Sequence, residues 1–310
     1  MSVARAVQLI TAQPVKASGK KKGEQPPPPS APEAKFAVSY LDAFGYLEKS
    51  LSGWKDIKFE DLSKAIGLFQ SWFGVKKSYQ LDPQTVKAME CPRCGHCDIT
   101  RKHHVSALAI KEFVNTNLPR WTKNGITYGF ASFVPGLTKD VQRQLAAKAF
   151  GAWTQYGNLT VSEGGGSTPD IVIGTGQGAR SNFDGPGGTL AWAYLPNGSN
   201  QQLEMRFDLG ETWVANPAQR GILYENVACH EFGHLLGLDH SKVQAALMAP
   251  YYNPAIPSPQ ANDDVPRFQA RYGVKTTPTA PPPVAPPAGP RPKVVLTGDI
   301  AVELNGVQLN

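Results

Sequence analysis

The segment from His230 to His240 constrains this chain more than any other part of the sequence. It reads H-E-F-G-H-L-L-G-L-D-H and holds three of the chain's six histidines. His230 and His234 are four residues apart, so on a helix both imidazoles project from the same face, one turn apart. Gly237 lets the chain leave the helix through an unhindered turn, after which His240 can return to the same point. The pattern predicts a zinc site with three protein ligands.

A glutamate beside the first ligand indicates what such a site would do. Three protein ligands leave the fourth position of zinc open, and the metal lowers the pKa of a water bound there to about 7. Glu231 could take the proton of that water and pass it to a departing amine. The alternatives are a chance cluster of histidines and a structural zinc, which normally has four protein ligands. The segment favours peptide-bond hydrolysis, with Glu231 as the general base.

The chain begins with a basic, proline-rich segment. Residues 1–35 hold six basic and two acidic side chains, a net of +4 out of the whole chain's +6. Few aromatic residues occur there, so we expect this tail to be disordered. The remainder is nearly neutral, so nucleic-acid binding is not expected. No apolar run reaches the roughly 18–20 residues of a membrane span, and residues 6–10 do not make a convincing signal peptide.

Hydrophobic periodicity predicts a small helical unit over residues 36–98. Its apolar residues recur at spacings of three and four, which places them on one helix face. They are Phe59, Leu62, Ile66, Phe69 and Phe73. Asp82 and Pro83 carry the signature of an N-cap followed by an N1 proline, and they predict a last short helix.

A mixed pattern follows and predicts a second domain over residues 105–273. Alternation at 126–130 and apolar runs at 159–161, 170–173, 190–194 and 205–207 favour strands. A helix from Thr138, a helix over 221–236 that carries the histidines, and a last helix from about 262 complete it. Residues 274–292 form a proline-rich linker, and 293–310 look like two short strands.

With Ser241 and the downstream sequence A-L-M-A-P at 246–250, the histidine segment resembles the matrixins, the matrix metalloproteinase branch of the metzincins. The resemblance implies an α/β (α+β) zincin-like fold, with a twisted, mostly parallel five-stranded sheet and three helices behind a helical prodomain. It also implies a zinc metalloendopeptidase of the extracellular matrix, made as a latent precursor. Met248 would form the Met-turn beneath the zinc. The implied substrate contacts are Leu190, Ala191, Asn226, Pro250 and Tyr252.

A second stretch, P-R-C-G at 92–95 closed by Asp98, resembles the cysteine switch of the family. The resemblance implies that Cys94 occupies the open zinc position in the latent form. The chain departs from the family at His96 and Cys97, where a small apolar residue and proline are usual. A purely structural role, a separate metal site and a disulfide therefore stay open. The metal site would use Cys91, Cys94 and Cys97 with His103 or His104, and the disulfide would join Cys91 to Cys97.

The glycine-rich loop at 184–188 resembles the calcium loop of the family, in which carboxylates and backbone carbonyls surround a hard cation. The implied ligands are Asp184, Gly185, Gly187, Thr189, Asp208 and Glu211. The alternative is a glycine-rich turn capped by Asp184. The family's structural zinc takes three histidines and one aspartate, but the matching positions here are Gln177, Ala179, Trp192 and Arg206. We therefore expect one catalytic zinc, and calcium.

The stretch from Tyr40 to Met89 resembles the helical prodomain of the family, which is related to peptidoglycan-binding modules. A second hypothesis is therefore a cell-wall-associated peptidase or binding protein that contacts peptidoglycan through this unit. By analogy with the family, we expect a secreted, extracellular monomer that acts on polypeptides.

Overall fold

The structure is a computed structural model that describes residues 10–11, 29–47, 58–99, 120–196, 198, 200–276, 295–297, 301–304 and 307–309. Contacts divide the chain into two units, residues 1–275 and residues 276–310, which are described separately. Within the described ranges, no helix combines the length and apolar character needed to cross a membrane.

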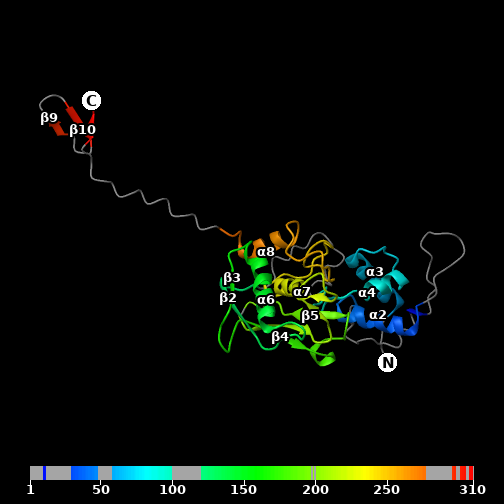
Figure 1. The fold of residues 1–310 in the computed structure, drawn as a ribbon. Helices are drawn as coiled ribbons and strands as arrows, with labels where there is room; N and C mark the ends of the chain where they lie inside the picture. The colour runs from blue at the N-terminus through cyan, green and yellow to red at the C-terminus, as the bar shows by residue number, and fades with distance from the viewer. Residues whose placement is uncertain are drawn as a thin grey trace. The chain divides into compact units, whose positions relative to one another are not determined.

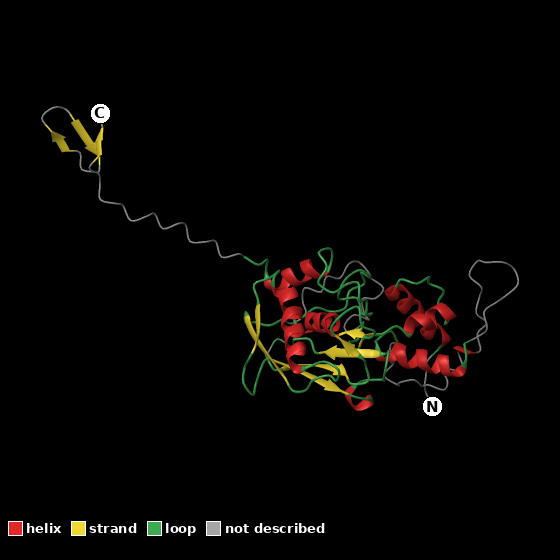
Figure 2. Cartoon of the chain, viewed as in Figure 1, coloured by secondary structure: helices red, strands yellow, loops and turns green. Residues whose placement is uncertain are grey.

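The first unit begins with three helices, α2 (Ala31–Ala43), α3 (Phe59–Phe73) and α4 (Pro83–Met89). Side chains cap two of them: Asp82 accepts from Thr85 N at 2.8 Å, as the sequence predicts, and Ser30, whose role was not predicted, accepts from Glu33 N. The apolar face of α3 is buried at Leu62, Ile66 and Phe69. Figure 2 shows the three helices gathered in one group. Helix α2 begins inside the segment that we expected to lack structure.

A six-stranded sheet follows, in the order β1-β5-β6-β4-β2-β3. Its strands are β1 (Arg93–Cys94), β2 (Gly125–Phe130), β3 (Thr160–Glu163), β4 (Ile171–Gly176), β5 (Thr189–Ala193) and β6 (Leu203–Asp208). Every neighbouring pair is parallel except β5 and β6. The expected mostly parallel five-stranded sheet is confirmed by β2 to β6. The sixth strand, β1, comes from the segment that resembles the cysteine switch, and it pairs with β5.

Three helices accompany the sheet: α6 (Lys139–Thr154), α7 (Tyr224–Leu235) and α8 (Asp264–Tyr272). Helices α6 and α7 pack against each other, and α7 also contacts β5 and β6 (Figure 1). The core between these layers includes the fully buried Phe150, Trp153 and Phe232. A short 3-10 helix, η2 (Ala179–Ser181), and a two-stranded pair, β7 (Trp213–Val214) with β8 (Ile222–Leu223), lie in the connections. Helix α7 begins later than the predicted residue 221.

The second unit contains an antiparallel sheet of β9 (Val295–Thr297), β10 (Ala301–Leu304) and β11 (Val307–Leu309), with β10 in the middle. We expected two short strands in this region, and its described residues form three.

Candidate metal centre

The three histidines of the H-E-F-G-H-L-L-G-L-D-H segment converge on one point. Helix α7 carries His230 and His234, and the chain returns after Gly237, whose φ of 92° lies in the left-handed region. The three imidazole centroids are 4.8 to 5.4 Å apart. Together with the Cys94 thiol they place four potential ligand atoms within 4.8 Å of one another, all on buried residues. The sequence therefore predicted a group that the fold brings together.

Backbone carbonyls orient the first two imidazoles. His230 Nδ1 donates to Leu247 O and His234 Nδ1 donates to Leu238 O, each at 2.7 Å. Carbonyl oxygens only accept, so they fix the proton on Nδ1 and leave Nε2 free to ligate. Burial lowers the pKa of His230 to about 4 and holds that of His234 well below its usual value. Both rings are therefore neutral at physiological pH, the form that binds a metal.

The unsatisfied polar atoms of the site fit a zinc ion. Among the described residues, Nε2 of His230 and Nε2 of His240 are buried without a hydrogen-bond partner. The Cys94 Sγ lies 3.4 Å from His234 Nε2. Orphaned buried polar atoms are rare in native proteins. Three imidazole nitrogens and a thiol that face one point would be satisfied together by one tetrahedral zinc.

Glu231 is fully buried beside this group. Among the described residues, the Cys94 thiol is the neighbour that interacts with its carboxylate, which makes no well-aligned hydrogen bond. Burial raises the pKa of Glu231 to about 8. A carboxyl group with a pKa near neutrality is suited to accept and return a proton.

Met248 packs beneath the metal-binding helix. It is fully buried, and a Cβ added at Gly233, between the two helical histidines, would lie only 2.2 Å from its Sδ. Glycine at this position therefore lets the two segments approach. Asp264, which the sequence analysis did not single out, holds the Met248 turn: its carboxylate accepts from Leu247 N at 2.7 Å and from Met248 N at 3.1 Å.

The segment around Cys94 lies between β5 and the chain that follows Met248. Arg93 N donates to Gly188 O at 3.0 Å, and Gly95 N donates to Ala191 O at 2.7 Å. On the other side, Cys94 N donates to Pro250 O and Tyr252 N donates to Pro92 O, each at 2.9 Å. The backbone of residues 92–95 thus hydrogen-bonds to β5 on one side and to the 250–252 segment on the other.

A buried ion pair anchors this segment. Arg93 donates to both carboxylate oxygens of Asp98, at 2.6 and 3.0 Å, and to Tyr40 OH at 2.6 Å. Its guanidinium lies 3.4 Å from the Phe44 ring centroid. Tyr46 OH also donates to Asp98, at 2.5 Å. The carboxylate that closes the P-R-C-G stretch therefore ties it to the helical unit.

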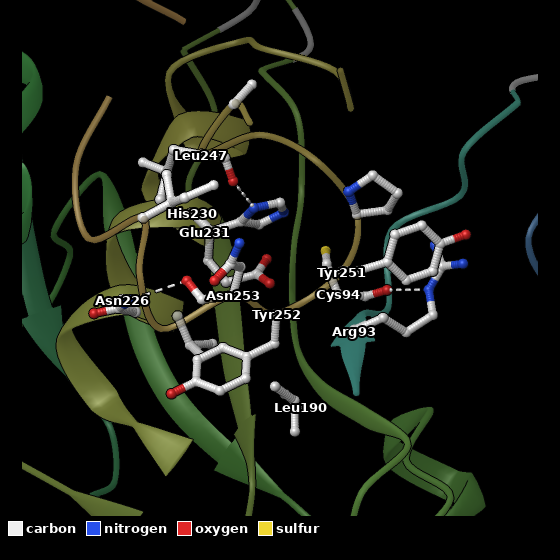
Figure 3. Close-up of a pocket in the computed structure, with 14 residues that line it drawn as sticks. Arg93, Cys94, Leu190, Asn226, His230, Glu231, Leu247, Tyr251, Tyr252 and Asn253 are labelled. Atoms are coloured by element: carbon white, nitrogen blue, oxygen red, sulfur yellow. Dashed lines mark hydrogen bonds between the residues drawn. The ribbon is translucent and has the colours of Figure 1, made fainter. Parts of the chain in front are cut away.

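A pocket opens next to Cys94, His230 and Glu231 (Figure 3). Four of the five residues predicted to contact substrate line it: Leu190, Asn226, Pro250 and Tyr252. The fifth, Ala191, is fully buried in β5, and its carbonyl accepts from Gly95 N. Asn226 Nδ2 donates to Asn253 O and Pro254 O at 3.4 and 3.3 Å, and these hydrogen bonds fix the 253–254 segment beside the pocket.

The predicted calcium loop forms a set of carboxylates with incomplete hydrogen bonding. Asp184 accepts from Thr189 N at 2.7 Å and Glu211 accepts from Gly187 N at 2.6 Å. Asp208 Oδ2 is buried and has no partner among the described residues. Burial, and then the neighbouring carboxylate of Asp184, raise the pKa of Asp208. Gly185 and Gly187 have φ values of 97° and 85°, which suit glycine. The orphaned carboxylate oxygen fits a hard cation.

Protein contacts hold the region where the family has its structural zinc. Trp192 Nε1 donates to Ser181 O at 2.8 Å, and Arg206 Nη1 donates to Thr175 O at 3.1 Å. Of the other two matching positions, Gln177 is exposed and Ala179 lies in η2. The Trp192 contact joins β5 to η2, and the Arg206 contact joins β6 to β4.

The cysteines flanking Cys94 do not support the alternative arrangements. Cys91 and Cys97 are both free thiols, not a disulfide. Among the described residues, Cys94 groups with the three histidines and not with its neighbouring cysteines. His103 and His104, the other residues of the alternative site, lie outside the described residues.

Comparison with known proteins agrees with this geometry. The family model described as Matrixin matches residues 120–273. Matrix metalloproteinase-19 of Homo sapiens is 35% identical over 244 residues, which cover 77% of this chain and 46% of that protein. Interstitial collagenase A of Mus musculus is 33% identical over 246 residues, which cover 78% of this chain and 50% of that protein. The chain spans about half the length of these curated relatives. Residues 120–273 form a matrixin domain, and the chain belongs to the matrixin family.

Proposed function

We propose that the chain is a latent zinc metalloendopeptidase, with His230, His234 and His240 as zinc ligands and Glu231 as general base. The observation that supports this most directly is the convergence of four buried ligand atoms within 4.8 Å. A zinc ion held there supplies Lewis acidity, which lowers the pKa of water and polarises a peptide carbonyl. The family assignment agrees with this chemistry.

The residues of the chain would perform three tasks in the reaction. The edge of β5 that pairs with β1, together with the 250–252 segment, would bind an extended polypeptide through its backbone, as both bind the prosegment. Leu190, Tyr252 and Asn226 line a pocket for an apolar side chain. Glu231 takes a proton from the attacking water and delivers it to the leaving amine.

Latency follows from the position of Cys94. Its thiol faces the same point as the three imidazoles, and its backbone occupies the substrate groove. Burial raises the pKa of this thiol well above its usual value, but a bound zinc ion would favour the thiolate. We propose that removal of residues up to about 98 frees both the metal position and the groove.

We also propose that Asp184, Asp208 and Glu211, with carbonyls of Gly185, Gly187 and Thr189, hold calcium. The orphaned Asp208 Oδ2 supports this. Secretion and a monomeric state are proposed as well, and sedimentation of the purified protein tests the latter. No described contact favours peptidoglycan binding by the helical unit, and a pull-down on purified cell wall would test it.

The test of the enzyme assignment compares four proteins. Wild type and Glu231→Ala are each assayed on casein before and after cleavage near residue 98. We expect activity only in cleaved wild type, and a loss of about 10²–10⁴-fold in the variant. Equal activity in cleaved Glu231→Ala, or none in cleaved wild type that contains zinc, would refute the proposal.

A further inference from the structure

His96 stands where the family has a small apolar residue, and its side chain reaches across to the matrixin domain. Its Nε2 lies 3.1 Å from Asp239 Oδ1, in a hydrogen bond between residues far apart in sequence. A carboxylate only accepts hydrogen bonds, so Nε2 carries the proton. Both side chains are largely buried, 16% and 11% exposed. A hydrogen bond to a charged group in such surroundings is stronger than one on an open surface.

The ring of His96 also covers the zinc ligands. Its centroid lies 4.4 Å from that of His234, with the planes 33° apart, and 5.5 Å from that of His240 in an edge-to-face arrangement. A small apolar side chain at this position could not make these contacts. The imidazole therefore adds both a ring contact and a hydrogen bond to the docked prosegment.

His240, which follows Asp239 in the same loop, makes a second contact with the prosegment. Asp98 Oδ1 lies 2.7 Å from His240 Nδ1, a close electrostatic contact that is not aligned as a hydrogen bond. Two consecutive residues, Asp239 and His240, thus face two prosegment side chains. From the other side, Arg267 holds the loop by donating to Asp239 O at 2.6 Å.

We propose that His96 is a second anchor of the prosegment. His96 binds the loop that carries His240, the third zinc ligand, through Asp239, and this contact is independent of the bond between Cys94 and zinc. This inference rests on the proposed latent zinc site. It assigns His96 a positioning role: the residue keeps the Cys94 thiol over the imidazoles by holding the chain immediately after it. The precursor would then stay closed through brief losses of the thiol contact.

The test measures how fast Cys94 is alkylated by iodoacetamide in the full chain, read by mass spectrometry of the Cys94 peptide. Alkylation requires the prosegment to open, so its rate reports the opening equilibrium. The variants are His96→Phe, which keeps a ring but loses the hydrogen bond, His96→Val, Asp239→Ala, and the double variant His96→Val/Asp239→Ala. Glu90→Ala, an exposed prosegment substitution, is the control. Thermal melts check that each variant is folded.

We expect each single variant to raise the alkylation rate roughly tenfold, from about 1.4 kcal/mol for the lost contact. His96→Val should exceed His96→Phe, the double variant should be no faster than the faster single variant, and Glu90→Ala should match wild type. Unchanged rates, or additive effects in the double variant, would overturn the proposal. Comparison of zinc-loaded with zinc-stripped wild type separates ligation of zinc by Cys94 from anchoring by His96. If zinc does not slow Cys94 alkylation, the proposed thiol ligation fails, whereas the comparison of the variants still tests His96.

Discussion

Replacement of Arg93 by alanine should activate the precursor without cleavage. Arg93 is 2% exposed, and its guanidinium pairs with both oxygens of Asp98, whose side chain is also fully buried. Without Arg93, the Asp98 carboxylate stays buried with Tyr46 as its remaining hydrogen-bond donor among the contacts described. Removal of one partner of a buried pair costs about 3–5 kcal/mol. When the prosegment leaves the groove, the carboxylate regains water, so this cost falls on the docked state.

The free-energy cost of losing Arg93 in the docked state can be tested directly. A cost of about 3–5 kcal/mol shifts the docked equilibrium by two to more than three orders of magnitude, since each 1.4 kcal/mol is tenfold. The assay is hydrolysis of a quenched fluorescent peptide by uncleaved precursor, as a fraction of the fully cleaved rate. Arg93→Lys is the matched control and should give an intermediate rate, because it keeps the charge but loses the bidentate geometry. After cleavage all three proteins have the same mature domain and should have equal kcat/KM. An Arg93→Ala precursor as latent as wild type would refute the reasoning.

Three further predictions concern parts outside the prosegment. The pKa values of Asp208 and Glu211 are raised in the folded protein without calcium, so the folded state binds more protons than the unfolded chain. The stability of the calcium-free protein should therefore fall as pH rises through the raised pKa values. The increase in melting temperature on adding calcium should therefore be larger at pH 7.5 than at pH 5, and a larger increase at pH 5 would contradict the site. Trp192→Phe removes the donor to Ser181 O, so it should cost about 1 kcal/mol in urea unfolding and speed proteolysis within 174–182 without altering zinc content. Asp264→Ala leaves buried amides of the Met248 turn unpaired, so the free energy of unfolding should fall by about 3 kcal/mol or more; a change below about 1 kcal/mol would argue against that role.

The metal ligands were predictable because most of their geometry is local. A spacing of four on one helix fixes the relation of His230 to His234, and Gly237 marks where the chain turns back. The resemblance to matrixins pointed to Cys94, and the structure brings this thiol to the imidazoles. The roles of Glu231, Cys94 and the calcium loop in the working protein stay predictions until they are measured.

The contacts that hold the prosegment were not predictable in the same way. Their partners lie far apart in sequence, as with His96 and Asp239 or Asp98 and His240, and only the folded chain brings them together. The departure at His96 was visible as a mismatch with the family, but the mismatch did not indicate a partner. Similarly, periodicity predicted the five strands of the matrixin domain, whereas β1 is only two residues long and exists because β5 offers it an edge.

The zinc content of the purified chain tests the central claim most directly. Elemental analysis should find one zinc per wild-type chain and almost none after replacement of His230, His234 or His240 by alanine. Two zinc ions per wild-type chain, or one zinc retained in all three variants, would contradict a single centre formed by these imidazoles.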